Sequence, residues 1–405
     1  MAIDQNQLAA ALDAIVEPEI GLPLGTLGLV REVKARRHRV RIELALPVAA
    51  WPGSDELADE VHRVALAVPG VEEIEFDLTV MRDDERAALR VTLRRNMFGV
   101  AEAEPALDTP DNGHEGHGHE GHDHAGHGHG QGAAADVPLF LQPDSATRVI
   151  GVSSGKGGVG KSTVTVNLAV ALAQAGHRVG LLDADVYGFS VPKMLGTDHD
   201  PIILGDVVIP TSAHGVKCLS MGYFVPDDQP VIWRGPMLHK AIQQFLTDAY
   251  WGQPDFVLID MPPGTGDVAL TLAEVMPRAE IVVVTTPQPA AQRVAQRSAF
   301  AARRLKLSVR GVIENMSWFT GDDGTRYELF GAGGGDTLAA DLGIPLLGQV
   351  PLVTAVRQGG DEGHPIVAVD RESETAQAFI RIADRLASLG PARVYRKELS
   401  LNPTA

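Results

Sequence analysis

The segment 155–162 constrains the fold of this chain more than any other stretch. Its sequence, GKGGVGKS, fits the pattern G-x-x-x-x-G-K-[ST], in which the backbone N–H groups of a glycine-rich loop surround phosphate oxygens. An apolar run precedes the loop at 149–152, and a helical pattern follows it at 162–175. A strand, a phosphate-binding loop and a helix in this order predict an α/β fold.

The chain beyond the loop alternates strand patterns with helical patterns. The expected strands, most of them near-continuous apolar runs, are 148–153, 179–183, 256–261, 281–285, 309–314 and 346–350. The expected helices are 162–175, 237–250, 288–305, 337–342 and 372–389. Apolar strands of this kind are typical of sheets that are covered on both faces. We therefore expect a doubly wound, mostly parallel sheet of the P-loop NTPase class over residues 143–395.

The first 142 residues divide into two parts. Residues 1–100 combine a helical pattern around Leu8 and Leu12 with strand patterns at 40–46 and 74–80 and an amphipathic helical pattern at 55–68, which predicts a small α+β domain. Gly, His, Glu, Asp, Ala and Pro dominate residues 101–142. Such a segment cannot bury enough apolar surface to offset the entropy of ordering, so we expect a flexible linker there.

Charge and cysteine content narrow the possible partners and location. The formal net charge of −17 disfavours binding to nucleic acid or to anionic membranes. The N-terminus has no signal-like pattern and no apolar run is long enough to span a bilayer, so we expect a cytoplasmic protein. The single cysteine, Cys218, excludes an intrachain disulfide and is expected to be buried and inert.

Individual residues of the loop and of the strand ends suggest magnesium-dependent hydrolysis of ATP. Lys161 would contact the β- and γ-phosphates, and the Ser162 hydroxyl would bind Mg²⁺ together with Asp260, which ends an apolar strand. Asp185 would orient or deprotonate the attacking water. The residues expected to bind the nucleotide through the loop are Gly155, Lys156, Gly157, Gly158, Val159, Gly160, Lys161, Ser162 and Thr163.

Simpler structural roles remain possible for some of these positions. An aspartate at a strand end often caps a helix or stabilises a turn, and this alternative is as good as a functional role for Asp183. The sequence Gly-Thr-Gly-Asp at 264–267 suits a loop that senses the γ-phosphate, but it also suits a plain turn.

Longer segments resemble a known family. The loop, with Lys156 directly after its first glycine, resembles the deviant Walker A motif of the MinD, ParA and nitrogenase iron protein superfamily. The segments LLDADVYGFSVPKMLG (181–196), VIWRGPMLHKAIQQFL (231–246) and FVLIDMPPGTGDVALTLAE (256–274) resemble the Mrp or ApbC group of iron–sulfur cluster carrier ATPases. The segment 12–30 resembles the small domain of iron–sulfur assembly factors.

This resemblance implies a homodimer that encloses two ATP molecules. In such a dimer Lys156 would reach the phosphates of the partner's nucleotide and stabilise their charge, while Asn315 would recognise adenine. The implied activity is binding of iron–sulfur clusters and their transfer to apoproteins, with iron–sulfur assembly factors as further partners.

The sequence departs from the family where the cluster ligands are expected. Carriers of this group place a C-x-x-C pair shortly after the motif at 314–317, but residues 314–335 contain no cysteine. Because iron–sulfur clusters depend on thiolate ligands, a cluster would need non-standard ligands or the thiols of a partner.

A histidine-rich tract offers a different metal site. It contains half of the histidines of the chain, namely His114, His117, His119, His122, His124, His127 and His129. Imidazole groups bind nickel or zinc, so a nickel or zinc metallochaperone ATPase is one alternative, although a solvated spacer explains the tract equally simply. A MinD- or ParA-like switch that dimerises with ATP and binds a scaffold is the other alternative.

Overall fold

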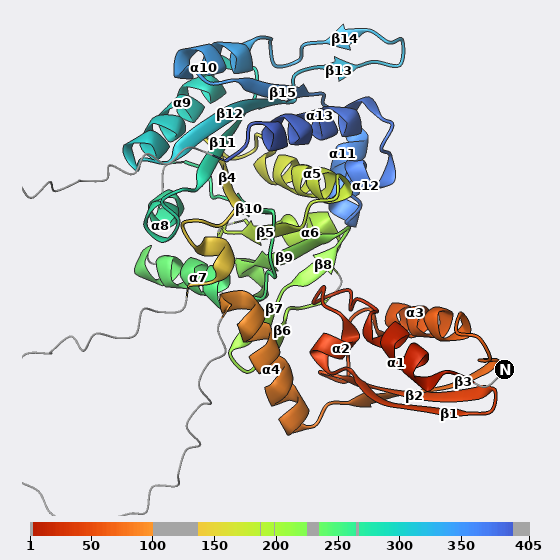
Figure 1. Cartoon of the computed structure of the whole chain (residues 1–405). Coiled ribbons are helices and arrows are strands. Elements are labelled where there is room, and N and C mark those ends of the chain that lie inside the picture. The colour runs from red at the N-terminus through yellow and green to blue at the C-terminus, as the bar shows by residue number, and fades with distance from the viewer. Residues whose placement is uncertain are drawn as a thin grey trace, which may run out of the picture.

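The computed structural model describes residues 3–99, 137–186, 188–197, 199–224, 235–264 and 267–391. A small N-terminal domain lies beside a larger α/β domain (Figure 1). None of the helices in these ranges has the length and apolar character required to cross a membrane.

An 8-stranded sheet forms the centre of the larger domain. In spatial order its strands are β15 (Leu346–Val350), β12 (Ser308–Asn315), β11 (Glu280–Thr285), β4 (Arg148–Ser154), β10 (Phe256–Asp260), β5 (Val179–Asp183), β9 (Val216–Ser220) and β8 (Thr211–Ala213). Neighbouring strands are parallel except for the antiparallel pair of β8 and β9. The doubly wound, mostly parallel sheet predicted from the sequence is confirmed.

Helices cover both faces of this sheet (Figure 1). One face carries α5 (Lys161–Gln174), α6 (Val191–Leu195), α12 (Ile366–Val369) and α13 (Glu374–Ser388), and α11 (Thr354–Glu362) lies next to α6. The other face carries α7 (Gly235–Thr247), α8 (Asp267–Val275), α9 (Pro289–Arg304) and α10 (Gly334–Leu342). Each face has its own apolar core, with Leu168 and Phe379 in the first and Leu272 and Val283 in the second.

Short elements complete the larger domain. They are η1 (Leu139–Leu141), η2 (Met221–Phe224) and the antiparallel pairs β6 (Ile202–Leu204) with β7 (Val207–Ile209) and β13 (Phe319–Thr320) with β14 (Arg326–Tyr327). Phe140 and Leu141 of η1 are buried in the core beneath α7 and α8. These two residues belong to the stretch that the sequence assigned to the linker, most of which lies outside the described residues.

The N-terminal domain packs helices against a 3-stranded sheet. Its elements are α1 (Gln5–Asp13), α2 (Leu24–Leu27), β1 (Val30–Arg36), β2 (Arg39–Leu46), α3 (Ser54–Leu66), β3 (Glu73–Val80) and α4 (Asp83–Phe98). The pair β1 and β2 is antiparallel, the pair β2 and β3 is parallel, and α1 and α3 lie on one side of the sheet (Figure 1).

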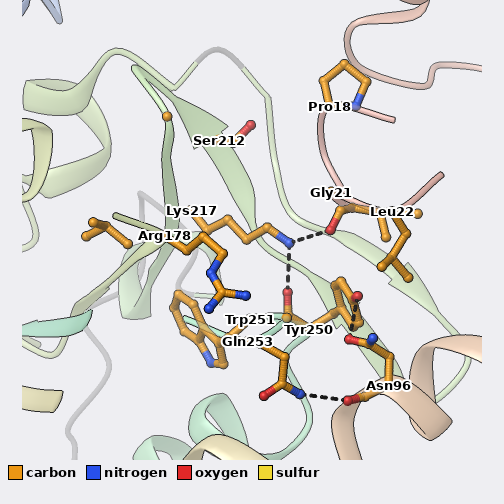
Figure 2. Close-up of a pocket in the computed structure, with 14 residues that line it drawn as sticks. Pro18, Gly21, Leu22, Asn96, Arg178, Ser212, Lys217, Tyr250, Trp251 and Gln253 are labelled. Atoms are coloured by element: carbon orange, nitrogen blue, oxygen red, sulfur yellow. Dashed lines mark hydrogen bonds between the residues drawn. The ribbon is translucent and has the colours of Figure 1, made fainter. Parts of the chain in front are cut away.

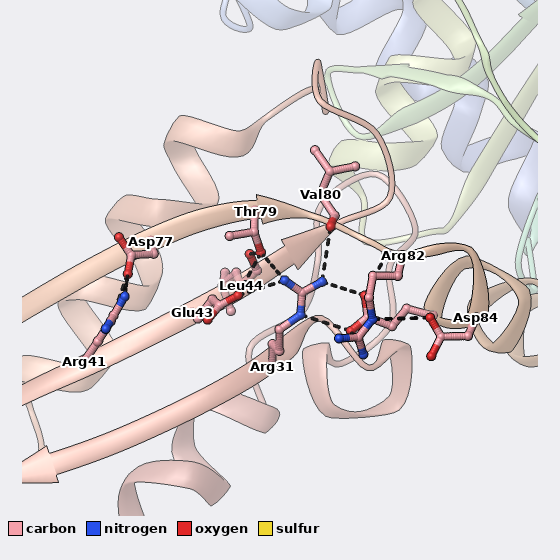
Figure 3. A network of polar contacts seen from close by, with 10 residues as sticks. Arg31, Arg41, Glu43, Leu44, Asp77, Thr79, Val80, Arg82 and Asp84 are labelled. Atoms are coloured by element: carbon pink, nitrogen blue, oxygen red, sulfur yellow. Dashed lines mark hydrogen bonds and ion pairs between the residues drawn. The ribbon is translucent and has the colours of Figure 1, made fainter.

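A polar network joins the strands of this domain to α4 (Figure 3). The Arg31 guanidinium of β1 donates hydrogen bonds to Glu43 of β2 at 2.8 Å and to Thr79 of β3 at 2.7 Å. Another nitrogen of Arg31 contacts Glu85, in the first turn of α4, at 2.6 Å. Hydrogen bonds to Arg31 and Arg82 lower the pKa of Glu85 to about 2, so this carboxylate stays charged and holds the start of α4.

The two domains share an apolar core. Leu204, Val207 and Ile209 of the β6–β7 hairpin, together with Tyr250, are buried among residues of the N-terminal domain. The Tyr250 hydroxyl donates a hydrogen bond of 2.9 Å to the Asn96 side chain near the end of α4, and Arg94 pairs with Asp206. The position of the N-terminal domain is thus fixed by packing as well as by polar contacts.

Candidate nucleotide-binding site

Two glycines give the loop between β4 and α5 its path. A Cβ atom on Gly155 would lie 2.3 Å from backbone atoms of Val294 and Ala295 in α9, so only glycine fits there. Gly160 has a φ of +78° and immediately precedes α5. A Cβ atom on Gly160 would also lie 2.2 Å from the side-chain nitrogen of Asn315. The loop therefore passes close to α9 and to Asn315 before α5 begins.

A cavity of about 180 Å³ lies over this loop. It is lined by Ser154, Lys156, Gly157, Gly158, Gly160, Lys161, Ser162, Thr163, Asp185, Ser190, Met194 and Pro263. This lining includes Asp185 and most of the loop residues that the sequence predicts to bind phosphate. Val159 is instead buried in the core at 2% exposure, and Gly155 packs against α9. The dimensions and the backbone N–H groups suit a chain of phosphates.

Asp260 is fully buried at the end of β10 and accepts hydrogen bonds from three side chains of α5. Lys161 Nζ and Ser162 Oγ each lie 2.6 Å from Asp260 Oδ2, and Thr165 Oγ1 lies 2.8 Å from Oδ1. A serine hydroxyl next to a carboxylate matches the oxygen ligands that Mg²⁺ prefers beside phosphates. The sequence analysis did not include Thr165, although its spacing of four residues from Lys161 places both on one face of α5.

The two aspartates around β5 occupy different environments. Asp185 Oδ2 lies 3.6 Å from Lys161 Nζ and borders the phosphate cavity. Asp183 is fully buried and accepts hydrogen bonds from the backbone N–H groups of Asp185, Ser190 and Val191. Burial, and secondarily the charge of Asp260, raise the pKa of Asp183 to about 7. Asp183 thus anchors the segment that presents Asp185 to the cavity.

Lys156 makes a contact different from that of Lys161. Its Nζ donates a hydrogen bond of 3.3 Å to Gln288, the residue that precedes α9. Lys161, by contrast, is only 6% exposed and contacts the buried carboxylates. The two lysines of the loop are therefore directed to different surroundings, one at the rim and one at the base of the cavity.

A second cavity, of about 310 Å³, adjoins the phosphate cavity and shares Gly160, Thr163 and Met194 with it. Its other lining residues include Asn315, Met316, Leu352, Val356, Arg357 and Asp361. The Asn315 side chain donates a hydrogen bond of 2.9 Å to the carbonyl of Val159, which ties the end of β12 to the loop. No pattern in the sequence indicates Arg357 and Asp361, because α11 approaches the loop only in the folded chain.

The start of the segment 264–267 is held on both sides. Gly264 N donates a hydrogen bond of 2.8 Å to the carbonyl of Ser154, and Ser298 Oγ donates one of 3.1 Å to the Gly264 carbonyl. Thr265, Gly266 and residues 225–234 lie outside the described part of the chain.

The structure offers no accessible thiol for a cluster. Cys218 lies in β9 with 0% exposure, and burial raises the pKa of its thiol well above the usual value. The segment after β12 forms the β13–β14 hairpin, without a cysteine. No group of three or more His, Cys, Asp or Glu side chains suited to a metal ion occurs within the described ranges, and the histidine-rich tract lies outside them.

A glycine-rich loop between a central parallel strand and a helix, with its lysine and serine bound to the aspartate of a neighbouring strand, defines a P-loop NTPase. Comparison with known families agrees. The chain belongs to the ParA family of P-loop NTPases, described as NUBPL iron-transfer P-loop NTPases, whose model matches residues 145–387. A second family model, described as iron–sulfur cluster assembly protein, matches residues 5–76. The family resemblance predicted from the sequence is confirmed.

Relatives match nearly the whole chain. An iron–sulfur cluster carrier protein of Mycobacterium leprae is 40% identical over 407 residues, covering 99% of this chain and 97% of the relative. A protein of the same name from Bacillus subtilis is 48% identical over 353 residues, covering 86% of this chain and 88% of the relative. A solved nucleotide-binding protein from Archaeoglobus fulgidus, in complex with ADP, is 33% identical, covers 57% of this chain and 91% of its own, and gives a TM-score of 0.49.

Proposed function

We propose that this protein is a magnesium-dependent ATPase that, as a homodimer, binds iron–sulfur clusters and transfers them to apoproteins. The observation that carries the proposal is the contact of Lys161 and Ser162 with the buried Asp260 at the phosphate cavity. It occurs in a chain that is 40% identical, over almost its entire length, to a protein named an iron–sulfur cluster carrier. We further propose three parts, namely a small assembly-type domain at 1–100, a linker at 101–142 and the ATPase domain at 143–395.

Each residue around the phosphate cavity has a distinct role in this proposal. Lys161 binds the β- and γ-phosphates, and Ser162 and Asp260 hold Mg²⁺, which neutralises phosphate charge when bound. Asp185, which Asp183 positions, orients the attacking water. Lys156, directed to the rim of the cavity, reaches the nucleotide of the partner subunit and stabilises the charge that develops during hydrolysis.

The adjoining cavity would accept the nucleoside. Its position next to Gly160 and Thr163 places a base at the end of the phosphate chain, and its mixed lining offers both apolar contacts and polar groups. Asn315 borders this cavity at the end of β12 and would recognise adenine, while Arg357 and Asp361 of α11 also line the cavity.

The cluster is cargo in this proposal, and its ligands do not come from a cysteine pair of this chain. Cys218 is buried with a raised thiol pKa, so it does not supply a thiolate at the surface. Thiolates of the client or of an assembly partner would then hold the cluster during transfer.

The test uses protein purified without oxygen. ATP hydrolysis with magnesium should be measurable, and reconstitution with iron, sulfide and an apoprotein client should load the client faster with ATP than without it. A Lys161→Ala variant should lose both effects. Hydrolysis without any transfer to the client would leave an ATPase with a different cargo, and absence of ATP binding would contradict the whole proposal.

The histidine-rich tract favours one second candidate, a nickel or zinc metallochaperone ATPase. Seven histidines within 114–129, in a chain without accessible thiols, suit Ni²⁺ or Zn²⁺. Deletion of residues 111–132 should then abolish tight binding of these ions in calorimetry. Unchanged stoichiometry after the deletion would exclude the tract as the cargo site.

A further inference from the structure

A further cavity lies where the two domains meet, away from the two cavities of the nucleotide site. This junction pocket has a volume of about 380 Å³ (Figure 2). Residues of both domains line it, among them Leu22 and Asn96 from the N-terminal domain and Arg178, Lys217, Tyr250 and Trp251 from the larger domain. The volume falls within the range of about 300–1,000 Å³ typical of small-molecule sites, which often lie between domains.

The charge of this lining is opposite to that of the protein. The chain has 52 acidic and 35 basic residues, yet Arg178 and Lys217 line the junction pocket and no aspartate or glutamate does. Figure 2 shows the side chains of Arg178 and Lys217 extending into the pocket from the same side. Lys217 has no carboxylate partner in the lining and can attract an anion, and the Arg178 guanidinium can add a contact although it also binds Asp255 outside the lining.

Lys217 is held in place by neutral groups. Its Nζ donates hydrogen bonds to the carbonyls of Ile20 at 3.1 Å and Tyr250 at 3.3 Å, and it lies 4.6 Å from the centre of the Tyr250 ring. No carboxylate in the described ranges forms an ion pair with it, although Glu17 and Glu19 lie near enough to act through their charge. An ammonium group has three N–H donors, so a ligand can accept one hydrogen bond in addition to the two carbonyls.

Further donors surround the same space. Arg178 uses Nε and Nη2 to bind Asp255, while its Nη1 makes no hydrogen bond within the described structure. Asn96 accepts hydrogen bonds from Tyr250 and Gln253 through its two oxygens, which leaves its side-chain NH₂ to donate. Trp251, which donates its own N–H to the Phe245 carbonyl, and Leu22 provide an apolar wall.

We propose that the junction pocket binds a small organic anion, whose carboxylate or phosphate group contacts Lys217 and Arg178 and whose apolar body packs against Trp251 and Leu22. This site is separate from the nucleotide site, because the two share no lining residue. A ligand there touches both domains and therefore stabilises their contact.

The test compares three probes of similar shape, namely benzoate, phenyl phosphate and the uncharged benzyl alcohol. Each is titrated into the full-length protein with magnesium and ADP present, which keeps phenyl phosphate out of the phosphate cavity. The indole N–H signal of Trp251 in a two-dimensional NMR spectrum reports binding, and a Trp251→Phe variant assigns it. We expect one or both anions to shift this signal and to bind at least about tenfold more tightly than benzyl alcohol. The preferred anion identifies the headgroup.

Matched variants locate the binding. Lys217→Met retains the length of the side chain and should weaken binding of the anion at least about tenfold, whereas Lys240→Met, in the exposed part of α7, should leave it unchanged. Arg178→Gln, at a side chain that is 66% exposed, tests the site without risk to the core and should weaken binding about threefold or more. Equal binding of benzyl alcohol and the anions, or no binding of any probe, would overturn the proposal. Full affinity for the anion in both Lys217→Met and Arg178→Gln would also overturn it.

Discussion

Asp260 shows how much of the site rests on single residues. Three side chains of α5 donate to its two oxygens, so the orientation of Lys161 and Ser162 depends on a carboxylate of another strand. Lys161 and Lys156 have different surroundings, and we expect their replacement to have different effects.

Lys161→Ala should weaken ATP binding at least about 100-fold, because it removes the cation at the base of the phosphate cavity. Lys156→Ala should leave ATP affinity within about threefold but lower kcat at least about tenfold, since its proposed contact forms only in the dimer during hydrolysis. Calorimetry with a non-hydrolysable ATP analogue and steady-state turnover separate the two effects. Wild-type kcat in Lys156→Ala would exclude a role for this lysine in trans.

The stability of the protein should respond to pH through Lys217. Burial lowers the pKa of Lys217 from 10.5 to about 8, so the native state loses this proton at lower pH than the unfolded chain does. Between pH 8 and 10.5 the unfolded state binds more protons, and native stability should rise with pH. Two carboxylates, those of Glu17 and Glu19, face Lys217. Burial raises the pKa of each above its ordinary value of 4.5.

The measurement is the difference in unfolding free energy between the wild type and Lys217→Met. Across this window the difference should change in favour of the wild type by up to roughly 3 kcal/mol. The exposed substitution Lys240→Met should give a difference that does not vary with pH. A flat difference for Lys217→Met would mean that the ammonium is well solvated.

At the scale of single residues, the sequence predicts only those site residues that belong to a local motif. The loop motif was sufficient to find Lys161 and Ser162, and the strand end was sufficient to find Asp260. The hydrogen bond from Asp185 N to Asp183 spans only two residues and matches the turn role that the sequence left open for Asp183. The contact of Lys156 with Gln288 joins segments that meet only after folding, and no spacing rule indicates it.

At the scale of elements, a buried ion pair joins the ends of three strands to α13. Glu280 of β11, 2% exposed, pairs with Arg148 of β4 at 2.5 Å and with Arg310 of β12 at 3.3 Å. Both arginines also donate hydrogen bonds to carbonyls at the end of α13 or directly after it. This cluster lies near the beginning of these strands, whereas the nucleotide site lies at their other end.

Glu280→Gln should lower the unfolding free energy by about 3 kcal/mol, because it leaves the buried charge of Arg148 without a carboxylate. Asp255→Asn, which breaks the exposed pair with Arg178, should cost less than about 1 kcal/mol. Urea denaturation of the two variants checks the contrast. Equal losses would show that burial does not govern the strength of these pairs.

Predictability of the elements follows their hydrophobic pattern. In the larger domain, six of the seven strands that pair in parallel are apolar runs, and these runs predicted the six strands to within a residue or two; β9 was not among them. Strand β1 and helix α4 were not predicted, because charged residues interrupt the apolar pattern in VREVKAR and in DDERAALRVTLRRNMF. Their positions depend instead on contacts such as those of Arg31.

At the scale of the whole molecule, the shared core makes the N-terminal domain part of the structure of the ATPase domain. Tyr250 is buried at 1% exposure and its hydroxyl reaches Asn96. We therefore expect the wild type to unfold in one transition. Magnesium and ADP should raise the midpoint of that transition and should also increase hydrogen-exchange protection in the N-terminal domain.

Tyr250→Ala should separate this transition into two and cost about 3–5 kcal/mol, because it leaves a large cavity between the domains. Only the transition of the larger domain should then respond to nucleotide. Tyr250→Phe keeps the ring and should cost about 1 kcal/mol with a single transition. Differential scanning calorimetry distinguishes these outcomes, and two transitions in the wild type would contradict a common core.

The burial of Cys218 has a practical consequence. The only cysteine of the chain, Cys218, is buried and does not contact solvent. A cysteine introduced on the surface would therefore be the sole site that reacts with a maleimide dye. One such substitution per experiment would allow fluorescence to follow conformational motion without first removing any natural residue.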